Sequence, residues 1–347
     1  MDMPGAISRV VENKNLSQDE MIEVMRSIMS GEATDAQIGG FLIGLRMKGE
    51  SVEEITAAAT VMRELATPVS VSHSADRLVD TCGTGGSGSD KFNVSTASAF
   101  VAAAAGVKIA KHGNRSASGK SGSADVLEAA GANIMLSPEQ VGECIEQIGV
   151  GFLFAQSHHS AMKYAIGPRK EMIARTVFNL LGPLTNPASA KRQLLGVYDR
   201  KWIKPIAEVL QNLGSEHVLV VHSEDGLDEI SISEKTYAVE LKNNVISEIE
   251  ITPENFGLTR SPLSELVIQD SQSSFALLEK ALSGEHEGAS NIVALNAGAA
   301  IYVSGLASSI EEGVEIAVGA IKSGAALKKM QEFSKFTQSI VNRGAQD

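Results

Sequence analysis

The sequence has little cysteine, few aromatic residues and no surplus of positive charge. Only Cys82 and Cys144 occur among 347 residues, and two distant cysteines provide neither a disulfide framework nor a metal-ligand spacing. Aromatic residues make up 4% of the chain, which favours a core of aliphatic helices and buried parallel strands over an aromatic-rich sandwich. A net charge of −12 argues against a general nucleic-acid-binding protein.

Long hydrophobic runs are also missing. The most apolar stretch, residues 97–110, is interrupted by Ser98, Gly106 and Lys108 and is too short to span a bilayer. The first ten residues have no basic region followed by an apolar run, so we predict no secretory signal. We therefore expect a cytoplasmic protein with neither a membrane partner nor a nucleic-acid partner.

The order of local patterns predicts an α/β fold with a small, mainly helical domain and a larger α/β domain. Three helix-start patterns of the type S/T-x-x-E/Q begin at Ser17, Thr34 and Ser51. From Leu78 onward, short apolar strands alternate with helical segments, which predicts a central, mostly parallel sheet with flanking helices. Residues 237–251 predict an additional antiparallel hairpin.

A glycine-rich loop, DTCGTGGSGSDKFNVST, follows the first of these strands at residues 80–96. Three of its glycines satisfy G-x-G-x-x-G, the dinucleotide-binding fingerprint. However, the helix is expected to begin too late for that fingerprint, and the next strand ends in Lys111 and His112 instead of an acidic ribose ligand. A phosphate-binding loop fits better, because Ser95 and Thr96 place hydroxyls at a helix start beside free backbone N–H groups.

A second loop, residues 111–125, carries Lys111, Arg115 and Lys120 among glycines and small hydroxylic residues. In an acidic chain, a cationic loop at a strand end indicates a polyanion site, and an ordinary solvated loop is the alternative. Two such loops at the carboxyl ends of neighbouring strands would face one crevice, which is where open α/β sheets bind ligands.

Two charged motifs complete the pattern. Asp228 and Glu229 follow the apolar strand at residues 217–222. Adjacent carboxylates suit Mg²⁺, which prefers oxygen ligands and often bridges to phosphates, although ordinary turn acids are the alternative. Arg169 follows Gly-Pro and is suited to holding a carboxylate bidentately or to forming a surface salt bridge.

Together these stretches resemble the anthranilate phosphoribosyltransferase family. The resemblance spans nearly the whole chain and depends most on KHGNRS and NLLGPLTNP, with GTGG, NVST, SGSAD and DGLDEIS in the expected order. It implies transfer of the 5-phosphoribosyl group of 5-phosphoribosyl diphosphate (PRPP) to the amine of anthranilate. The products would be N-(5-phospho-β-D-ribosyl)anthranilate and pyrophosphate, in the second step of tryptophan synthesis from chorismate. The resemblance further implies a Mg²⁺ cofactor and a homodimer.

The same resemblance implies domain limits and a site. The helical domain would comprise residues 1–70 and about 170–187, and the α/β domain residues 76–169 and 188–347. Gly83 would border both substrates, and Asn114 and Arg169 would contact anthranilate. The chemistry of the reaction, apart from the resemblance, makes His112 a candidate to accept a proton from the amine. Mg²⁺ would be bound by Ser95, Asp228 and Glu229. The PRPP site would be lined by Gly86, Ser87, Lys91, Asn93, Val94, Ser95, Thr96, Lys111, His112, Gly113, Asn114, Arg115, Ser116, Ala117, Ser118, Gly119 and Ser123.

The sequence departs from the family pattern at three positions. Ser87 stands where the family usually has an acid, and Asp90 is a candidate to compensate. Lys91 replaces a small hydroxylic residue, and Gly119 replaces a serine. Two other functions stay open. A pyrimidine nucleoside phosphorylase would share the fold but carry KMSGRG-like text in place of KHGNRS, and a non-enzymatic nucleic-acid-binding relative would need a basic surface.

Overall fold

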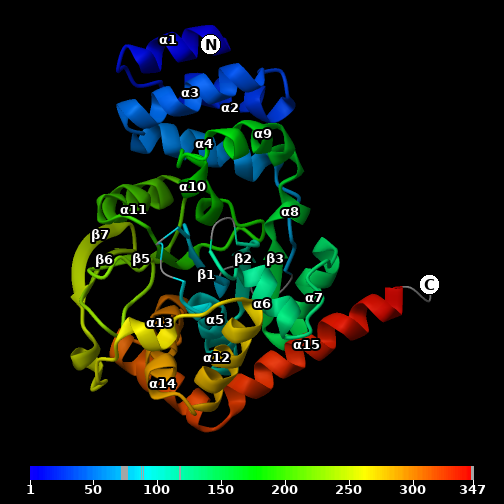
Figure 1. Ribbon diagram of the computed structural model, residues 1–347, viewed down its shortest axis with the longest axis vertical. Coiled ribbons are helices and arrows are strands. Elements are labelled where there is room, and N and C mark those ends of the chain that lie inside the picture. The colour runs from blue at the N-terminus through cyan, green and yellow to red at the C-terminus, as the bar shows by residue number, and fades with distance from the viewer. Residues whose placement is uncertain (72–76, 87, 89, 117–118, 345–347) are drawn as a thin grey trace.

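The structure is a computed structural model that describes residues 1–71, 77–86, 88, 90–116 and 119–344. A small helical part, formed largely by the N-terminal residues, lies on one side of a seven-stranded sheet, and the C-terminal helices lie on the other (Figure 1). The predicted fold class is therefore confirmed. No helix in the described ranges has the length and apolar character needed to cross a membrane.

The N-terminal part contains four helices: α1 (Met3–Val11), α2 (Gln18–Ser30), α3 (Asp35–Lys48) and α4 (Val52–Leu65). The three predicted helix starts are confirmed, because Ser17, Thr34 and Ser51 each accept a backbone hydrogen bond within a complete capping box. A buried ion pair joins two of these helices, with Lys48 Nζ 2.8 Å from Glu54 Oε2. Glu54 Oε1 also accepts a hydrogen bond from the backbone N–H of Leu16 at 2.9 Å.

A later stretch of the chain, residues 155–187, returns to these helices, and we call it the hinge region. It contains α8 (Ala155–His158), η2 (Ser160–Met162), α9 (Lys163–Met172), α10 (Phe178–Leu181) and η3 (Gly182–Leu184). Helix α9 packs on α2 and α3, and α10 packs on α4. Ala165 and Phe178 belong to the same apolar core as the N-terminal helices. The exact domain limits stay a prediction, and the limit at residue 76 lies outside the described residues.

The sheet has the strand order β3-β2-β1-β4-β5-β6-β7. The first five strands in chain order pair in parallel, and β6 and β7 are antiparallel additions. The two-residue turn between β6 and β7 has both asparagines, Asn243 and Asn244, at positive φ, which matches the twist of a hairpin and confirms the predicted one. The strands are β1 (Val79–Gly83), β2 (Ile109–Gly113), β3 (Val150–Phe154), β4 (Arg192–Gly196), β5 (His217–Ser223), β6 (Thr236–Lys242) and β7 (Val245–Ile251).

Helices bury both faces of this sheet. On β5, Leu219 and Val221 face one apolar core and Val218 and Val220 face the other, as the two-residue period of a strand requires. The helical part and α11 (Ile203–Asn212), preceded by η4 (Arg200–Trp202), cover one face. The elements on the other side are α5 (Val94–Ala104), α6 (Ser123–Ala129), α7 (Pro138–Ile148), η5 (Pro253–Phe256), η6 (Leu263–Leu266), α12 (Ser271–Ser283), α13 (Glu287–Ser304), α14 (Ile310–Lys322) and α15 (Ala325–Gly344).

Candidate active site

The predicted loops meet at the carboxyl edge of the parallel strands. β1 and β4 pair in register so that their last residues, Gly83 and Gly196, lie side by side. Strand β5 pairs with β4 on its other side, and the segment after β5 contains Asp228 and Glu229. The sheet order therefore brings the glycine loop after β1 next to a carboxylate pair that follows it by about 140 residues.

The glycine loop wraps around Asp228. The backbone N–H of Gly85 donates to Asp228 Oδ2 at 3.0 Å. A Cβ on Gly83 would lie 2.7 Å from Asp228 Oδ2, and a Cβ on Gly196 would lie 1.6 Å from the Asp228 carbonyl oxygen. These two glycines are needed because the Asp228 backbone and carboxylate occupy the space that a side chain would fill.

Lys91 lies between the two carboxylates. Its Nζ is 3.2 Å from Asp228 Oδ1 and 2.7 Å from Glu229 Oε2. Burial raises the pKa of Glu229 to about 7 although Lys91 opposes the shift. Burial acts in the same direction on Asp228, but Lys91 and the Gly85 N–H outweigh it and lower the pKa of that carboxyl. The two acids are thus held in different electrostatic environments by one ammonium group.

Lys111 and His112 lie in β2, in agreement with the expectation that they end the second strand. The Lys111 ammonium is buried and donates to the Thr81 carbonyl at 2.5 Å and to Ser95 Oγ at 3.2 Å. Burial lowers the pKa of Lys111, and the nearby carboxylate of Asp80 opposes this shift. Lys111 thus connects the ends of β1 and β2 to the first turn of α5.

His112 is held in one tautomer by the hinge region. Its Nδ1 is 3.1 Å from the carbonyl oxygen of Gly182, and because a carbonyl only accepts, Nδ1 carries the proton. Its Nε2 is buried and has no hydrogen-bond partner among the described residues. Burial and the neighbouring His159 lower the pKa of His112 to about 3, so the neutral imidazole is a weak base.

Asp80 and Asn186 support this part of the site, and the sequence analysis missed both. Asp80 Oδ1 accepts from the His112 backbone N–H at 3.1 Å, and Asp80 Oδ2 accepts from Asn186 Nδ2 at 2.8 Å. Burial raises the pKa of Asp80 to about 6, with Lys111 opposing the shift. Asp80 begins the quoted glycine-loop stretch and Asn186 lies near the end of the NLLGPLTNP motif, but only the sheet order brings the two residues together.

Asn93 links the first loop to the second. Its Oδ1 accepts from Ser121 Oγ at 2.9 Å and from Ser274 Oγ at 2.7 Å, and its Nδ2 donates to the Ser121 carbonyl at 3.1 Å. Asn93 precedes Val94, the first residue of α5, and Thr96 follows in the first turn. Thr96 Oγ1 is buried and has no hydrogen-bond partner among the described residues.

The second loop is closed by its own polar contacts. Asp125 Oδ2 accepts from the backbone N–H groups of Ser116 at 3.0 Å and Gly122 at 2.8 Å. Ser123 Oγ donates to the Asn114 carbonyl at 3.2 Å, and Ser116 Oγ accepts from the Gly119 N–H at 2.7 Å. A Cβ on Gly113 would lie 2.2 Å from Ser123 Oγ. Ala117 and Ser118, like Ser87 in the first loop, lie outside the described residues.

Arg115 does not point an unpaired cation into the crevice. Its guanidinium forms ion pairs with Asp125 at 3.0 Å and Glu128 at 2.5 Å. The guanidinium also lies over the Phe154 ring, 5.7 Å from its centroid. Contacts between Arg115 and a diphosphate would therefore have to compete with two carboxylates of α6.

The hinge region contributes Arg169 and Arg175, of which Arg175 contacts the glycine loop. Arg169 in α9 lies over the Phe178 ring at 5.1 Å, and no ion pair to a carboxylate is found for it in the described ranges of the chain. Arg175 donates to the Gly86 carbonyl and lies over the Tyr198 ring at 4.3 Å. The sequence analysis did not include Arg175 among the site residues. Arg175 thus ties the glycine loop to the segment that joins the two domains.

The donor chemistry of this edge fits Mg²⁺. Asp228, Glu229 and Ser95 supply hard oxygen atoms, the ligands that Mg²⁺ prefers. No cluster of three or more His, Cys, Asp or Glu side chains close enough to hold a metal is found in the part of the chain that the structure describes. Two carboxylates and one hydroxyl leave coordination positions open on Mg²⁺, so the residues present fit an ion that a substrate's phosphates help to coordinate.

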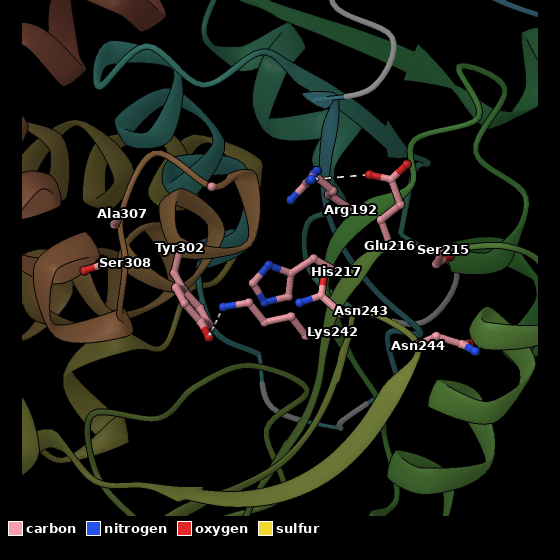
Figure 2. Close-up of a pocket in the computed structure, with 11 residues that line it drawn as sticks. Arg192, Ser215, Glu216, His217, Lys242, Asn243, Asn244, Tyr302, Ala307 and Ser308 are labelled. Atoms are coloured by element: carbon pink, nitrogen blue, oxygen red, sulfur yellow. Dashed lines mark hydrogen bonds and ion pairs between the residues drawn. The ribbon is translucent and has the colours of Figure 1, made fainter.

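A separate cavity of about 470 Å³ lies at the opposite, amino edge of β4 and β5 (Figure 2). Two pairs of its polar lining residues contact each other. Arg192 lies 3.3 Å from Glu216, and Lys242 Nζ donates to Tyr302 Oη at 3.0 Å. The carboxyl-edge residues described above are not part of its lining.

The fold and site define a two-domain glycosyltransferase. Residues 75–327 match the glycosyl transferase family, a/b domain, and residues 4–66 match the glycosyl transferase family, helical bundle domain. Anthranilate phosphoribosyltransferase of Marinomonas sp. (strain MWYL1) is 60% identical over 344 residues and is covered to 99%, as is this chain. The enzyme of the same name from Halorhodospira halophila is 57% identical over 98% of this chain and 99% of its own length.

Solved structures agree with this assignment. Anthranilate phosphoribosyltransferase from Thermus thermophilus has a TM-score of 0.90 and 42% identity, covering 96% of this chain and 99% of that one. The Saccharomyces cerevisiae enzyme in complex with PRPP and Mg has a TM-score of 0.88 and 26% identity, covering 97% and 98%. The chain therefore belongs to the anthranilate phosphoribosyltransferase family. This confirms the predicted enzyme class, and neither the nucleoside phosphorylase nor the nucleic-acid-binding alternative is supported.

Proposed function

We propose that the carboxyl edge of β1, β2, β4 and β5 is where this chain transfers the phosphoribosyl group of PRPP to anthranilate. The observation that carries the proposal is the contact of the glycine loop with Asp228, because it joins a phosphate-binding loop to a metal-binding acid. The Gly85 N–H to Asp228 Oδ2 hydrogen bond of 3.0 Å and the tight approach at Gly83 and Gly196 support it.

The PRPP site is proposed to lie between the first and second loops. Asn93 holds the two loops together through Ser121, and α5 begins at Val94, so that its N-terminal end and the hydroxyls of Ser95 and Thr96 lie at the junction of the loops. Such a helix start favours phosphate through its N–H groups and its dipole. The other proposed PRPP contacts are Gly86, Ser87, Lys91, Val94, Lys111, His112, Gly113, Asn114, Arg115, Ser116, Ala117, Ser118, Gly119 and Ser123.

Asp228, Glu229 and Ser95 would hold Mg²⁺, which when bound would neutralise negative charge on the departing pyrophosphate. The chain's own cations act in the same direction. Lys111 is fixed by Thr81 and Ser95 next to the start of α5, so it requires little reorganisation as charge grows on the leaving group. No covalent nucleophile is needed, because the amine of anthranilate attacks C1 of the ribose directly.

Anthranilate is proposed to bind where the hinge region faces the loops. Gly83 would border both substrates, Arg169 would pair with the anthranilate carboxylate, and Asn114 would contact the same substrate. The guanidinium of Arg169 is held over Phe178, and burial lowers its pKa, so it approaches a carboxylate with part of its hydration already removed. Positioning two substrates in line contributes at most about 7–11 kcal/mol to lowering a barrier.

His112 as a proton acceptor stays a prediction, and two observations bear on it. Its Nε2 carries the lone pair, but burial lowers its pKa to about 3 and the atom has negligible exposure to solvent. A homodimer, a cytoplasmic location and the domain limits given above likewise remain predictions.

The proposal is tested by mixing the protein with anthranilate, PRPP and Mg²⁺ and following the loss of anthranilate fluorescence. We expect PRPP-dependent loss that requires Mg²⁺ and falls sharply in the double variant Asp228→Asn, Glu229→Gln. Phosphorolysis of uridine or thymidine in place of this reaction would overturn the assigned activity, and unchanged metal dependence in the double variant would overturn the proposed metal ligands.

A further inference from the structure

The closest cation to the proposed metal ligands belongs to the chain itself. The Lys91 ammonium contacts Asp228 at 3.2 Å and Glu229 at 2.7 Å, and the three side chains are 10%, 8% and 12% exposed. We propose that Lys91 is an internal counter-ion for this carboxylate pair, so that a divalent cation binds there only by displacing the ammonium. This inference rests on the proposed role of Asp228 and Glu229 as metal ligands.

The backbone around Lys91 is held by the segment that contains η6. Lys91 forms an antiparallel bridge with Val267, the Phe92 N–H donates to the Leu266 carbonyl at 3.0 Å, and the Ile268 N–H donates to the Asp90 carbonyl at 2.7 Å. The ammonium is therefore carried by a fixed backbone, and its long flexible stem is the part that can move. Lys91 can exchange partners without rearrangement of the strands.

The charges explain why the ammonium lies against Asp228 and Glu229. Two adjacent buried carboxylates repel each other and require a positive charge. Gly85 donates to one oxygen of Asp228, and Lys91 contacts the other oxygen and Glu229. A single ammonium offsets one of the two negative charges. A divalent cation offsets both, but it must first replace the lysine.

The displaced ammonium has a second partner available during the proposed reaction. Lys91 lies between the glycine loop and α5, the elements proposed to hold the diphosphate of PRPP. An ammonium released from Asp228 and Glu229 can pair with phosphate oxygens. PRPP therefore lowers the cost of releasing Lys91, and the metal and PRPP are predicted to strengthen each other's binding by the same factor.

The proposed counter-ion role depends on a position at which this chain departs from the usual family pattern. By the resemblance described above, the position of Lys91 is usually held by a small hydroxylic residue. A serine side chain at the same backbone position would be neutral and too short to bridge the two carboxylates. A metal could then bind to the carboxylate pair without displacing a lysine at this position.

The direct test measures Mn²⁺ binding to the metal-free full-length protein in the absence of both substrates. The EPR signal of free Mn²⁺ reports how much of the ion is unbound. We expect Lys91→Ser to lower the dissociation constant at least about ten-fold, which equals about 1.4 kcal/mol. Lys235→Ser is the matched control. It removes the same charge from an exposed ion pair, Lys235–Glu250 at 3.3 Å, and should leave the constant unchanged. Asp228→Asn with Glu229→Gln in the Lys91→Ser background should abolish the gain.

A second measurement uses the unaltered protein and does not depend on the variant folding. Acetylation of lysines, read out by mass spectrometry, should be slow at Lys91 without metal and faster with Mg²⁺, while the rate at Lys235 stays constant. PRPP should also tighten Mn²⁺ binding more in the unaltered protein than in Lys91→Ser. Two results would overturn the inference. The first is a Mn²⁺ dissociation constant of Lys91→Ser that lies within two-fold of the value for the unaltered protein. The second is a rate of Lys91 acetylation that does not change with Mg²⁺.

These outcomes are separable from failure of the proposed function. If the protein converts anthranilate and PRPP in a Mg²⁺-dependent way that requires Asp228 and Glu229, but Lys91→Ser does not change Mn²⁺ binding, only the counter-ion role is wrong. If the double variant binds and uses the metal as the unaltered protein does, the proposed ligands themselves are wrong, and the inference falls with them.

Discussion

Gly196 sits at the point where the last residue of β4 touches the backbone of the proposed metal-binding segment. A methyl group at this position would lie 1.6 Å from the Asp228 carbonyl oxygen and 2.3 Å from its carbonyl carbon. Side chains are rarely found closer than about 3 Å to such atoms, so Gly196→Ala must push the Asp228 backbone away by more than 1 Å. Overpacking usually costs about 1–3 kcal/mol, and because backbone on both sides must move we expect the upper end of that range.

The assay is thermal unfolding combined with the Mg²⁺ dependence of turnover. For domains of 150–250 residues about 1 kcal/mol shifts the melting temperature by roughly 2–4 °C, so about 3 kcal/mol predicts a fall of about 6–12 °C. The same shift moves the Asp228 carboxylate, a proposed metal ligand, out of the position that the Gly85 N–H holds, so half-maximal turnover should need several-fold more Mg²⁺. Gly319→Ala is the matched control, since a Cβ there meets open space inside α14 and alanine is favoured in helices. A Gly196→Ala protein that melts and responds to Mg²⁺ as Gly319→Ala does would refute the reasoning.

Three further variants test separate parts of the structure. Arg169→Ala should raise the KM for anthranilate much more than the KM for PRPP, because it removes a carboxylate partner, and an unchanged anthranilate KM in steady-state kinetics would contradict that role. Lys48→Met leaves the buried Glu54 carboxylate without its cation and should destabilise the protein by about 3–5 kcal/mol, measured by urea unfolding; an unchanged midpoint would show that the pair contributes nothing. Burial raises the pKa of Asp80 to about 6 from its ordinary value of 3.8, so the folded state holds this proton more tightly and the group's contribution to stability falls as pH rises from about 4 to about 6. The free energy of unfolding should therefore fall by at most about 3 kcal/mol over this pH range. Urea midpoints of Asp80→Asn should not show this fall, and if both proteins have the same pH profile, the buried carboxyl is not its source.

Features that depend on neighbouring residues were predictable from the sequence. The capping box at Ser17 needs only Ser17 and Glu20, and the hairpin turn needs only two asparagines that tolerate positive φ. The meeting of the glycine loop with Asp228 and Glu229 was also predictable in outline, because parallel strands place their carboxyl ends at one edge. The alternation of strands and helices along the α/β part is the pattern that predicts these parallel strands.

Contacts that depend on which strands are neighbours were not predictable in the same way. Lys111 was expected at a strand end and at the start of a cationic loop, but the burial of its ammonium against Thr81 and Ser95 was not predicted. Arg115 was expected to face a polyanion, yet Asp125 and Glu128 of the next helix already pair with it. The number of basic residues in a stretch of sequence does not reveal which of them already form ion pairs, because tertiary packing determines which acid lies next to each one.

Lys91 shows how far this difference reaches into function. From the sequence, Lys91 is both a departure from the family pattern and one of the residues expected to line the PRPP site, where its ammonium would contact phosphate if it were directed into the crevice. The direction is set by a backbone bridge to Val267 and by the neighbouring positions of β1, β4 and β5, which bring Asp228 and Glu229 within reach. The ammonium can then pair either with the carboxylates or with a phosphate. On the proposed counter-ion role, the free-energy difference between these two pairings contributes to the binding of both the metal and PRPP. On the proposed counter-ion role, a single side-chain substitution would couple the binding of metal and PRPP, while the atoms proposed to contact the reacting bond stay the same.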